Sequence, residues 1–243
     1  MSADATGRRL IGMLTPSSNT TLEPVCAAIL ADLPGVSAHF GRFRVTRIAL
    51  ADDALAQFDH TELLRAAELL GDARCQVIAW NGTSAGWLGF EHDRDLCRQI
   101  EAATGAKATT TTLASADLFA RWGMKRIGLV TPYTDDVQAA IVHHYGEEGL
   151  DCGVERHLGI SENFAFSEVP PDRLATMCRE VAPDVDAVMI YCTNLNGAAV
   201  AAEVEAEIGK PVVDSVALTV WHCLDRLGVD MTPVRSWGRL FTS

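Results

Sequence analysis

Cys192 is the residue whose type and surroundings best suit chemistry. It follows the apolar run 187–191 and precedes Thr193 and Asn194, a pattern typical of a buried strand that opens into a loop. At a strand end that faces a helix N-terminus, we expect the thiolate to be stabilised. Such a cysteine serves as general acid, general base or nucleophile. A cysteine that only packs in the core fits the position equally well.

The other six cysteines have weaker claims to a chemical role. An odd total of seven, without C-x-x-C spacing, predicts neither a zinc site nor a disulfide framework. In a reducing compartment such cysteines serve mostly as small buried hydrophobic residues. They are Cys26, Cys97, Cys178 and Cys223 in helical patterns, Cys75 before a strand and Cys152 in a loop.

Neither a metal nor a nucleotide cofactor is expected. His143, His144 and His222 lie in helical stretches without a third ligand at metal spacing. No G-x-G-x-x-G motif follows a strand and no P-loop is present.

Four loops that follow apolar runs are rich in hydroxyl and amide side chains and poor in acids. Serine and asparagine before a helix cap it, and a helix N-terminus attracts anions. We expect these side chains, with nearby backbone amides, to cradle a carboxylate or a developing enolate. Caps and turns without a ligand are the alternative. The loops are 16–21 with Ser17 and Ser18, 81–84 with Thr83 and Ser84, 132–134, and 192–194 with Thr193 and Asn194.

The elements that position these loops occur twice in the chain. Three segments of the first half return in the same order in the second half, and a fourth phrase, 121–124, returns as 226–229. Strands that alternate with helices predict a mostly parallel sheet in each half, with the ligand site beyond the carboxyl ends of the strands. The paired segments are 9–16 and 126–132, 76–84 and 186–194, and 105–111 and 209–215, and helical patterns cover 61–70, 93–102, 171–181 and 198–208.

We therefore predict an α/β fold with two pseudo-symmetric Rossmann-like lobes. Each lobe has a mostly parallel four-stranded sheet flanked by helices, and the site lies in the cleft between lobes. The helices after Thr111 and after Ser215 are expected to cross between lobes. The first lobe is then residues 1–113 plus 219–243, and the second is 114–218.

Charge and composition limit the classes of molecule that we expect this protein to bind. A formal net charge of −12 disfavours general binding to nucleic acid or to an anionic membrane. No stretch approaches the roughly 18 apolar residues of a bilayer span, and residues 1–9 lack the apolar core of a signal peptide. We expect a cytoplasmic protein with a small carboxylate as partner, and assembly into a homo-oligomer is left open.

The polar loops also carry a family resemblance. Taken together, the segments 13–21, 81–84, 131–136 and 191–194 resemble the aspartate/glutamate racemase superfamily. More narrowly, they resemble its branch of maleate cis–trans isomerases and arylmalonate decarboxylases, and residues 238–241 look like the decarboxylase terminus. The resemblance runs over nearly the whole chain and implies two lobes with the site between them.

Gly82 is the most informative departure from the racemases and isomerases. The resemblance implies one cysteine from each lobe in those enzymes, but here Cys192 fills the second-lobe position and Gly82 the first. Arylmalonate decarboxylases resemble this chain in having that glycine and a single second-lobe cysteine. There, loss of CO2 leaves an enediolate that the cysteine protonates on one face. The resemblance also implies that Tyr133 donates a hydrogen bond to a carboxylate or enolate.

Other positions resemble the isomerases. Asn19 and Asn163 match isomerase positions that hold substrate carboxylates, and Arg42 falls where decarboxylases line a pocket for departing CO2. A cation or amide there stabilises the charged ground state and opposes decarboxylation. Arg42 as a solvated surface residue is the alternative. The leading hypothesis is arylmalonate-type decarboxylation with Cys192 as proton donor, followed by maleate isomerisation or racemisation, and then by a non-catalytic protein that binds small acids.

Overall fold

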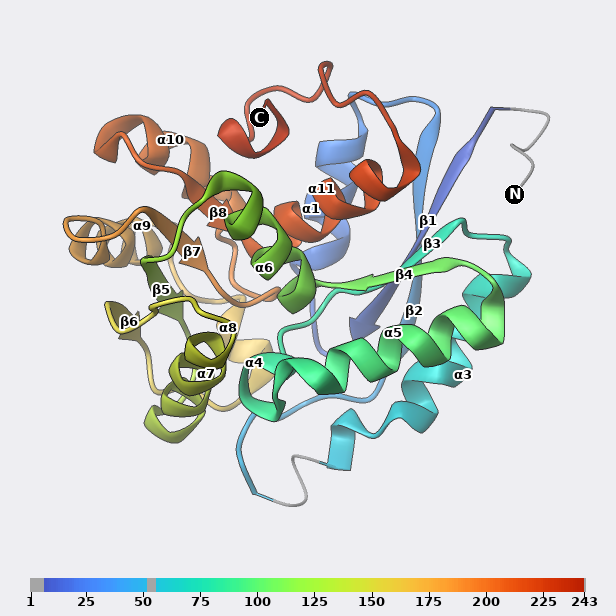
Figure 1. The fold of residues 1–243 in the computed structure, drawn as a ribbon, viewed down its shortest axis with the longest axis horizontal. Coiled ribbons are helices and arrows are strands. Elements are labelled where there is room, and N and C mark those ends of the chain that lie inside the picture. The colour runs from blue at the N-terminus through green and yellow to red at the C-terminus, as the bar shows by residue number, and fades with distance from the viewer. Residues whose placement is uncertain (1–6, 52–55, 243) are drawn as a thin grey trace.

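The chain forms two four-stranded parallel sheets (Figure 1), seen in a computed structural model that describes residues 7–51 and 56–242. The strand orders, β2-β1-β3-β4 and β6-β5-β7-β8, are equivalent, so the predicted two-lobed α/β fold is confirmed. The strands are β1 (Arg9–Pro16), β2 (Val36–Phe43), β3 (Val77–Trp80), β4 (Lys107–Thr110), β5 (Ile127–Thr131), β6 (Glu155–His157), β7 (Ala187–Ile190) and β8 (Val212–Asp214).

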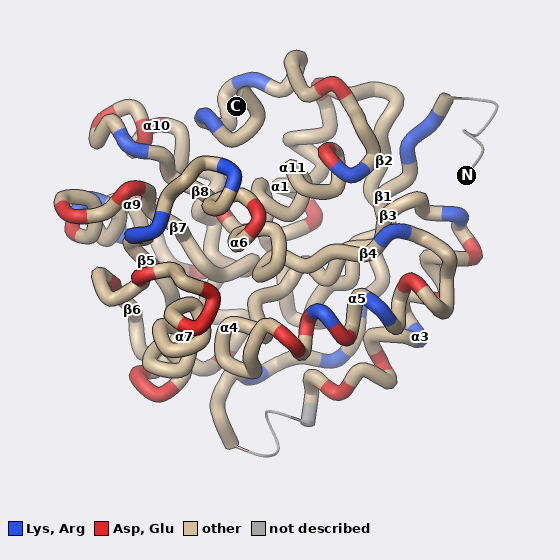
Figure 2. The backbone as a smooth tube through the Cα atoms, in the orientation of Figure 1, with Lys and Arg blue, Asp and Glu red and all other residues tan. Residues whose placement is uncertain are grey.

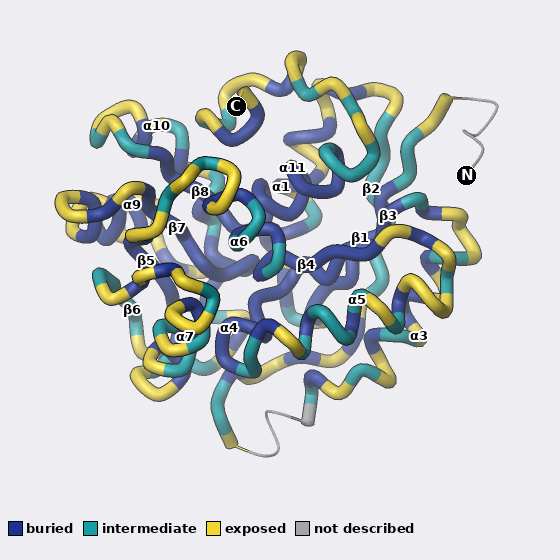
Figure 3. Tube along the Cα trace, viewed as in Figure 1, coloured by how far each residue is buried: buried dark blue, intermediate teal, exposed yellow. Residues whose placement is uncertain are grey.

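The central strands are apolar because helices cover both of their faces. Every residue of β3, β5 and β7 is buried, as Figure 3 shows for the middle of the molecule. Parallel strands buried on two sides lack alternation, which explains why the sequence shows short continuous apolar runs. The edge strands β2 and β6 are only partly buried and carry no such run.

Helices pack against the sheets in the positions that a doubly wound fold requires. In the first sheet, α3 and α5 contact one face, and α1 and α11 contact the other. In the second sheet, α9 and α10 lie side by side along the strands. The helices are α1 (Leu22–Leu30), α3 (His60–Asp72), α4 (Ala85–Leu88), α5 (Phe90–Thr104), α6 (Thr111–Trp122), α7 (Asp135–Glu147), α8 (Asn163–Phe166), α9 (Pro171–Val181), α10 (Ala198–Ile208) and α11 (Ser215–Leu227), with short 3₁₀ turns η1 (Ala56–Phe58) and η2 (Arg239–Phe241).

Helices α6 and α11 join the two sheets. Each begins directly after the last strand of its half, and a strand-end residue caps it: Thr110 accepts from Leu113 N–H, and Asp214 accepts from Val216 N–H. Helix α11 follows the second sheet but packs on β3 and β4 of the first. This placement supports lobe boundaries at 1–113 plus 219–243 and at 114–218, which remain a proposal.

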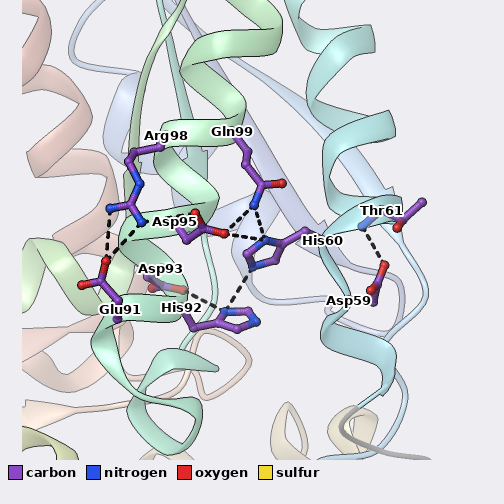
Figure 4. A network of polar contacts seen from close by, with 9 residues as sticks. All are labelled: Asp59, His60, Thr61, Glu91, His92, Asp93, Asp95, Arg98 and Gln99. Atoms are coloured by element: carbon purple, nitrogen blue, oxygen red, sulfur yellow. Dashed lines mark hydrogen bonds and ion pairs between the residues drawn. The ribbon is translucent and has the colours of Figure 1, made fainter.

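Charged residues lie mainly on the outer helices and loops, and the central strands are almost free of them (Figure 2). A polar network joins α3 to α5 there (Figure 4): His60 contacts His92 and Gln99 at nitrogen–nitrogen distances of 3.4 and 3.1 Å. Burial lowers the pKa of His60, so its ring is neutral near pH 7. Among the helices of residues 7–51 and 56–242, none is both long and apolar enough to cross a bilayer.

Candidate active site

The four polar loops meet around one small cavity, where the carboxyl ends of the two sheets face each other. The cavity has a volume of about 20 Å³, room for about one water molecule. Any larger ligand must therefore displace lining side chains. The lining residues are Pro16, Val45, Ile48, Phe58, Trp80, Gly82, Thr83, Ser84, Trp87, Tyr133, Asn163, Phe166, Cys192 and Thr193.

Hydroxyl groups from both lobes lie close together in the lining of the cavity. The Thr83 hydroxyl and the Tyr133 phenol are 2.6 Å apart. Ser84 Oγ accepts a hydrogen bond from Trp80 Nε1 at 3.0 Å, so its own hydrogen is free to be donated. Burial raises the pKa of Tyr133, and the nearby Cys192 thiol adds to the shift. The phenol is therefore protonated at neutral pH and is a donor.

Cys192 lies in the cavity wall but is not a stabilised thiolate, which corrects our expectation. Burial raises the pKa of the thiol to about 11, although the Asn194 N–H, 3.4 Å from the sulfur, and the Tyr133 phenol both lower it. The physical reason is twofold: the side chain is 3% exposed, and no helix starts at Cys192, since α10 begins only at Ala198. A protonated thiol suits a proton donor better than a nucleophile.

Gly82 leaves no empty space beside the cavity, because the indole of Trp80 fills it. A Cβ atom on residue 82 would lie 2.1 Å from Trp80 Cζ2 and 2.4 Å from Cε2. Such distances are far below van der Waals contact, so residue 82 cannot carry a side chain while the ring stays in place. Within the described part of the chain, Cys192 is the one cysteine that lines the cavity.

Asn19 and Asn194 join the lobes through hydrogen bonds behind the cavity. Asn19 Nδ2 donates to the Thr193 carbonyl at 3.0 Å, and its Oδ1 accepts from the Leu22 N–H at the start of α1. Asn194 Oδ1 accepts from the Thr20 N–H, and its Nδ2 donates to the Asn163 carbonyl at 2.6 Å. Neither Asn19 nor Asn194 lines the cavity. Their role as direct carboxylate ligands stays a prediction.

Asn163 differs from these two because its side chain does line the cavity. Its Oδ1 lies 3.4 Å from Asn194 Nδ2, and its Nδ2 has no hydrogen-bond partner among residues 7–51 and 56–242. This amide is available to a ligand.

Ser17, Ser18 and Arg42 hold the first loop rather than face the cavity. The two serine hydroxyls donate to the Val45 carbonyl at 3.3 and 2.6 Å. The Arg42 guanidinium donates to the Ser17 and Asn19 carbonyls, both at 3.0 Å, and pairs with Glu23 at 2.8 Å. None of the three lines the cavity, and a contact with substrate remains a prediction for each.

The apolar half of the lining was missed as a site by sequence reasoning. Trp87 is buried with its Nε1 unpaired and packs edge-on against Tyr133 and Phe58. Phe166 also packs edge-on against Tyr133. Apolar residues in loops give no pattern that separates the wall of a pocket from the core. The one available signal was that Trp80 and Trp87 flank the polar loop that contains Gly82. No charged side chain occurs among the fourteen lining residues.

One expectation about metals needs correction. Glu147 supplies the third potential ligand that His143 and His144 were expected to lack, with ligand atoms within 4.8 Å of one another. The reason is helical spacing, because Glu147 lies one turn beyond both histidines on α7. His144 Nδ1 already contacts Glu147 at 2.8 Å. An acidic residue beside surface histidines is common without a metal, and the cluster lies outside the cavity lining.

Comparisons with known proteins point to one branch of enzymes. The family model described as arylmalonate decarboxylase matches residues 11–241. Arylmalonate decarboxylase of Bordetella bronchiseptica is 28% identical over 235 residues, 95% of each chain. Maleate isomerase of Pseudomonas putida is 30% identical over 235 residues, 92% of this chain and 93% of that one.

Solved structures agree with this similarity. The maleate isomerase Iso of a Pseudomonas putida strain superposes with a TM-score of 0.89 at 27% identity, covering 97% of this chain and 98% of that one. A glycine-to-cysteine, cysteine-to-serine double mutant of arylmalonate decarboxylase gives 0.85 at 25% identity, covering 96% and 98%. Arylmalonate decarboxylase itself gives 0.77 at 26% identity, covering 96% and 99%.

Proposed function

Because this chain belongs to the arylmalonate decarboxylase family, within the aspartate/glutamate racemase superfamily, we propose that it is a cofactor-independent decarboxylase. Its substrate is a small malonate-type dicarboxylate with an apolar group on the α-carbon. Cys192 donates the proton that replaces the lost carboxylate.

The reaction divides into two balanced steps. In the first, the bond between the α-carbon and one carboxylate breaks, CO2 leaves, and the electron pair stays behind as an enediolate. In the second, the Cys192 S–H protonates the α-carbon, and the thiolate regains a proton from water. Thr83, Ser84 and Tyr133 donate hydrogen bonds to the enediolate oxygens, with the backbone amides that follow Gly82 and Cys192.

The observation that carries the proposal is the single thiol. Cys192 comes from the end of the second sheet, and the corresponding place at the end of the first sheet is filled by the Trp80 indole over Gly82. A racemase needs a proton donor on each face of its carbanion, whereas a decarboxylase needs one. The raised pKa of Cys192 keeps this donor protonated at neutral pH.

The apolar half of the cavity supports the same reaction. A carboxylate beside Val45, Ile48 and Phe58 contacts apolar side chains and loses part of the solvation that stabilises its charge. CO2 and the enediolate-forming transition state carry less localised charge than that carboxylate, so the apolar wall favours departure.

Maleate-type isomerisation is the second candidate, and Asn163 is the observation that favours it. Asn163 lines the cavity, and its Nδ2, which has no hydrogen-bond partner among the described residues, can hold a second carboxylate, which fits the similarity to maleate isomerases. Asn19, the other expected isomerase-like ligand, is already bound to Thr193 and Leu22.

Incubation with phenylmalonate and, separately, with maleate tests these alternatives. We expect CO2 from phenylmalonate and a product that takes one deuterium at the α-carbon in D2O, followed by NMR. Fumarate from maleate without CO2 release would instead establish the isomerase. Binding of both acids by calorimetry, with neither converted, would leave the non-catalytic binding protein.

A further inference from the structure

The contact between Trp80 and Gly82 has a consequence for stereochemistry. Trp80 is the last residue of β3, and its ring lies over residue 82. The distance from a residue-82 Cβ to three atoms of the six-membered ring is 2.1 to 2.5 Å, so the ring occupies the volume of a side chain at that position.

The indole is fixed in this volume from two sides. Its Nε1 donates to Ser84 Oγ at 3.0 Å, and its ring packs against Phe43 with centroids 5.1 Å apart. The side chain is 1% exposed. A buried ring held by a hydrogen bond and an aromatic contact cannot swing away cheaply, because leaving breaks both and opens a cavity.

Trp80 also lines the same cavity as Cys192. The thiol belongs to the second-sheet end of that cavity and the indole to the first-sheet end. A hydrophobic ring at the first-sheet end leaves no volume there for a second thiol on residue 82.

We propose that Trp80 is the specificity-determining residue that makes protonation one-sided: its ring seals the first-sheet end of the cavity, so that only Cys192 reaches the α-carbon. The inference rests on the proposed decarboxylation for its stereochemical part. Its structural part, the mutual exclusion of the indole and a side chain at residue 82, stands without it.

Trp80→Val tests the seal. Removal of the ring admits water to the first-sheet end, so we expect the minor enantiomer formed from an α-methyl-α-arylmalonate to rise at least tenfold, measured by chiral chromatography. Trp87→Val is the matched control, because Trp87 lines the same cavity but is not among the ring contacts of residue 82. An unchanged enantiomer ratio in Trp80→Val, or an equal change in both variants, would overturn the proposal.

A double-mutant cycle tests the exclusion without any activity. Gly82→Cys alone should lower the urea unfolding midpoint, because the new side chain and the indole overlap. In the Trp80→Val variant the new side chain has room, so adding Gly82→Cys there should lower the midpoint by much less than it does in the wild type, and this recovery is the interaction that the cycle measures. Trp87→Val/Gly82→Cys should show no such recovery. A Gly82→Cys variant as stable as the wild type would refute the exclusion.

Failure of the decarboxylase proposal can be told apart from failure of the inference about Trp80. If the wild type releases no CO2 from any arylmalonate, the decarboxylase proposal fails while the unfolding cycle still decides the role of Trp80. If CO2 release depends on Cys192 but the enantiomer ratio ignores Trp80, the stereochemical inference fails and the function stands.

Discussion

The Thr83 hydroxyl, after β3, and the Tyr133 phenol, after β5, lie 2.6 Å apart and join the ends of the two sheets at the cavity. Because burial keeps Tyr133 protonated, we expect its O–H to stabilise the enediolate. Tyr133→Phe removes one preorganised donor and should lower kcat for arylmalonate decarboxylation by roughly 10²-fold, measured as initial CO2 release at saturating substrate.

Tyr145→Phe is the control for this change. Tyr145 is equally buried, and its phenol bonds to Ser115 at 2.8 Å, but it does not line the cavity. We expect its kcat to stay close to that of the wild type. Equal losses in the two variants would mean that Tyr133 acts through packing and not through the enediolate.

Cys192→Ala should nearly abolish product formation. The variant keeps the cavity but lacks the proton donor, so we expect kcat to fall by at least about 10²-fold. Because the thiol pKa is about 11, the acid form persists at neutral pH and is lost only as pH rises through that value. The kcat/KM profile of the wild type should therefore show no fall from this thiol between pH 7 and 9.

Cys178→Ala controls for the loss of a buried thiol, since Cys178 packs in α9 away from the cavity. It should lower stability but retain the wild-type pH profile. A fall in wild-type kcat/KM centred near pH 8 that Cys192→Ser removes would contradict the raised pKa.

The sequence predicted three strands of each sheet, the edge strands β4 and β8 included, and missed the edge strands β2 and β6. Ala187–Ile190 is a continuous apolar run because helices cover it on both sides, and α9 and α10 begin and end where their patterns predicted. Glu155–His157 is too short and too exposed to give a run. Val36–Phe43 alternates apolar and polar residues from Val36 to Phe40, a strand pattern that we did not recognise because this partly buried strand has no continuous apolar run.

The sequence predicted those residues of the candidate site that lie in loops at the ends of strands. Thr83, Tyr133 and Cys192 lie in loops that parallel topology brings to one edge, and they do line one cavity. The partners that decide how a side chain is used come from elsewhere in the chain. Asn19 is committed to Thr193, 174 residues away, and no spacing rule predicts such a contact. The pKa of Cys192 likewise depends on burial, which sequence position alone does not give.

Asn19→Ala should destabilise the protein more than it weakens substrate binding. The variant loses the hydrogen bonds from the first N–H groups of α1 and the one to the Thr193 carbonyl. We expect the free energy of unfolding to fall by about 2–3 kcal/mol, measured by urea denaturation. Asn19→Asp keeps the acceptor for α1 but loses the donor to Thr193, and separates the two contributions. A wild-type unfolding midpoint combined with a large rise in KM would instead make Asn19 a substrate ligand.

Asp214→Asn should change how stability depends on pH. Burial raises the pKa of Asp214 from 3.8 to about 7, although its Oδ1 accepts the N–H groups of Val216 and Ala217, both at 2.9 Å. Between pH 4 and 7 the folded carboxyl therefore holds a proton that the unfolded one has lost. The proton on the folded Asp214 carboxyl stabilises the protein fully below pH 4, and this stabilisation is lost as the pH rises through 7. The loss in the free energy of unfolding is about 4 kcal/mol as an upper limit.

Asparagine keeps the Oδ1 cap of α11 and has no proton to lose, so Asp214→Asn removes this slope. We expect its free energy of unfolding in urea, relative to the wild type, to increase from pH 5 to 7 and to level off by pH 8. Asp59→Asn is the matched control: Asp59 caps α3 through the Thr61 N–H, but it is exposed and its pKa is lowered. Its difference from the wild type should be flat over that range, because both folded and unfolded carboxyls are already ionised. Parallel curves for Asp214→Asn and the wild type would mean that Asp214 is ionised throughout, and that the charge beside the Cys192 strand end is permanent.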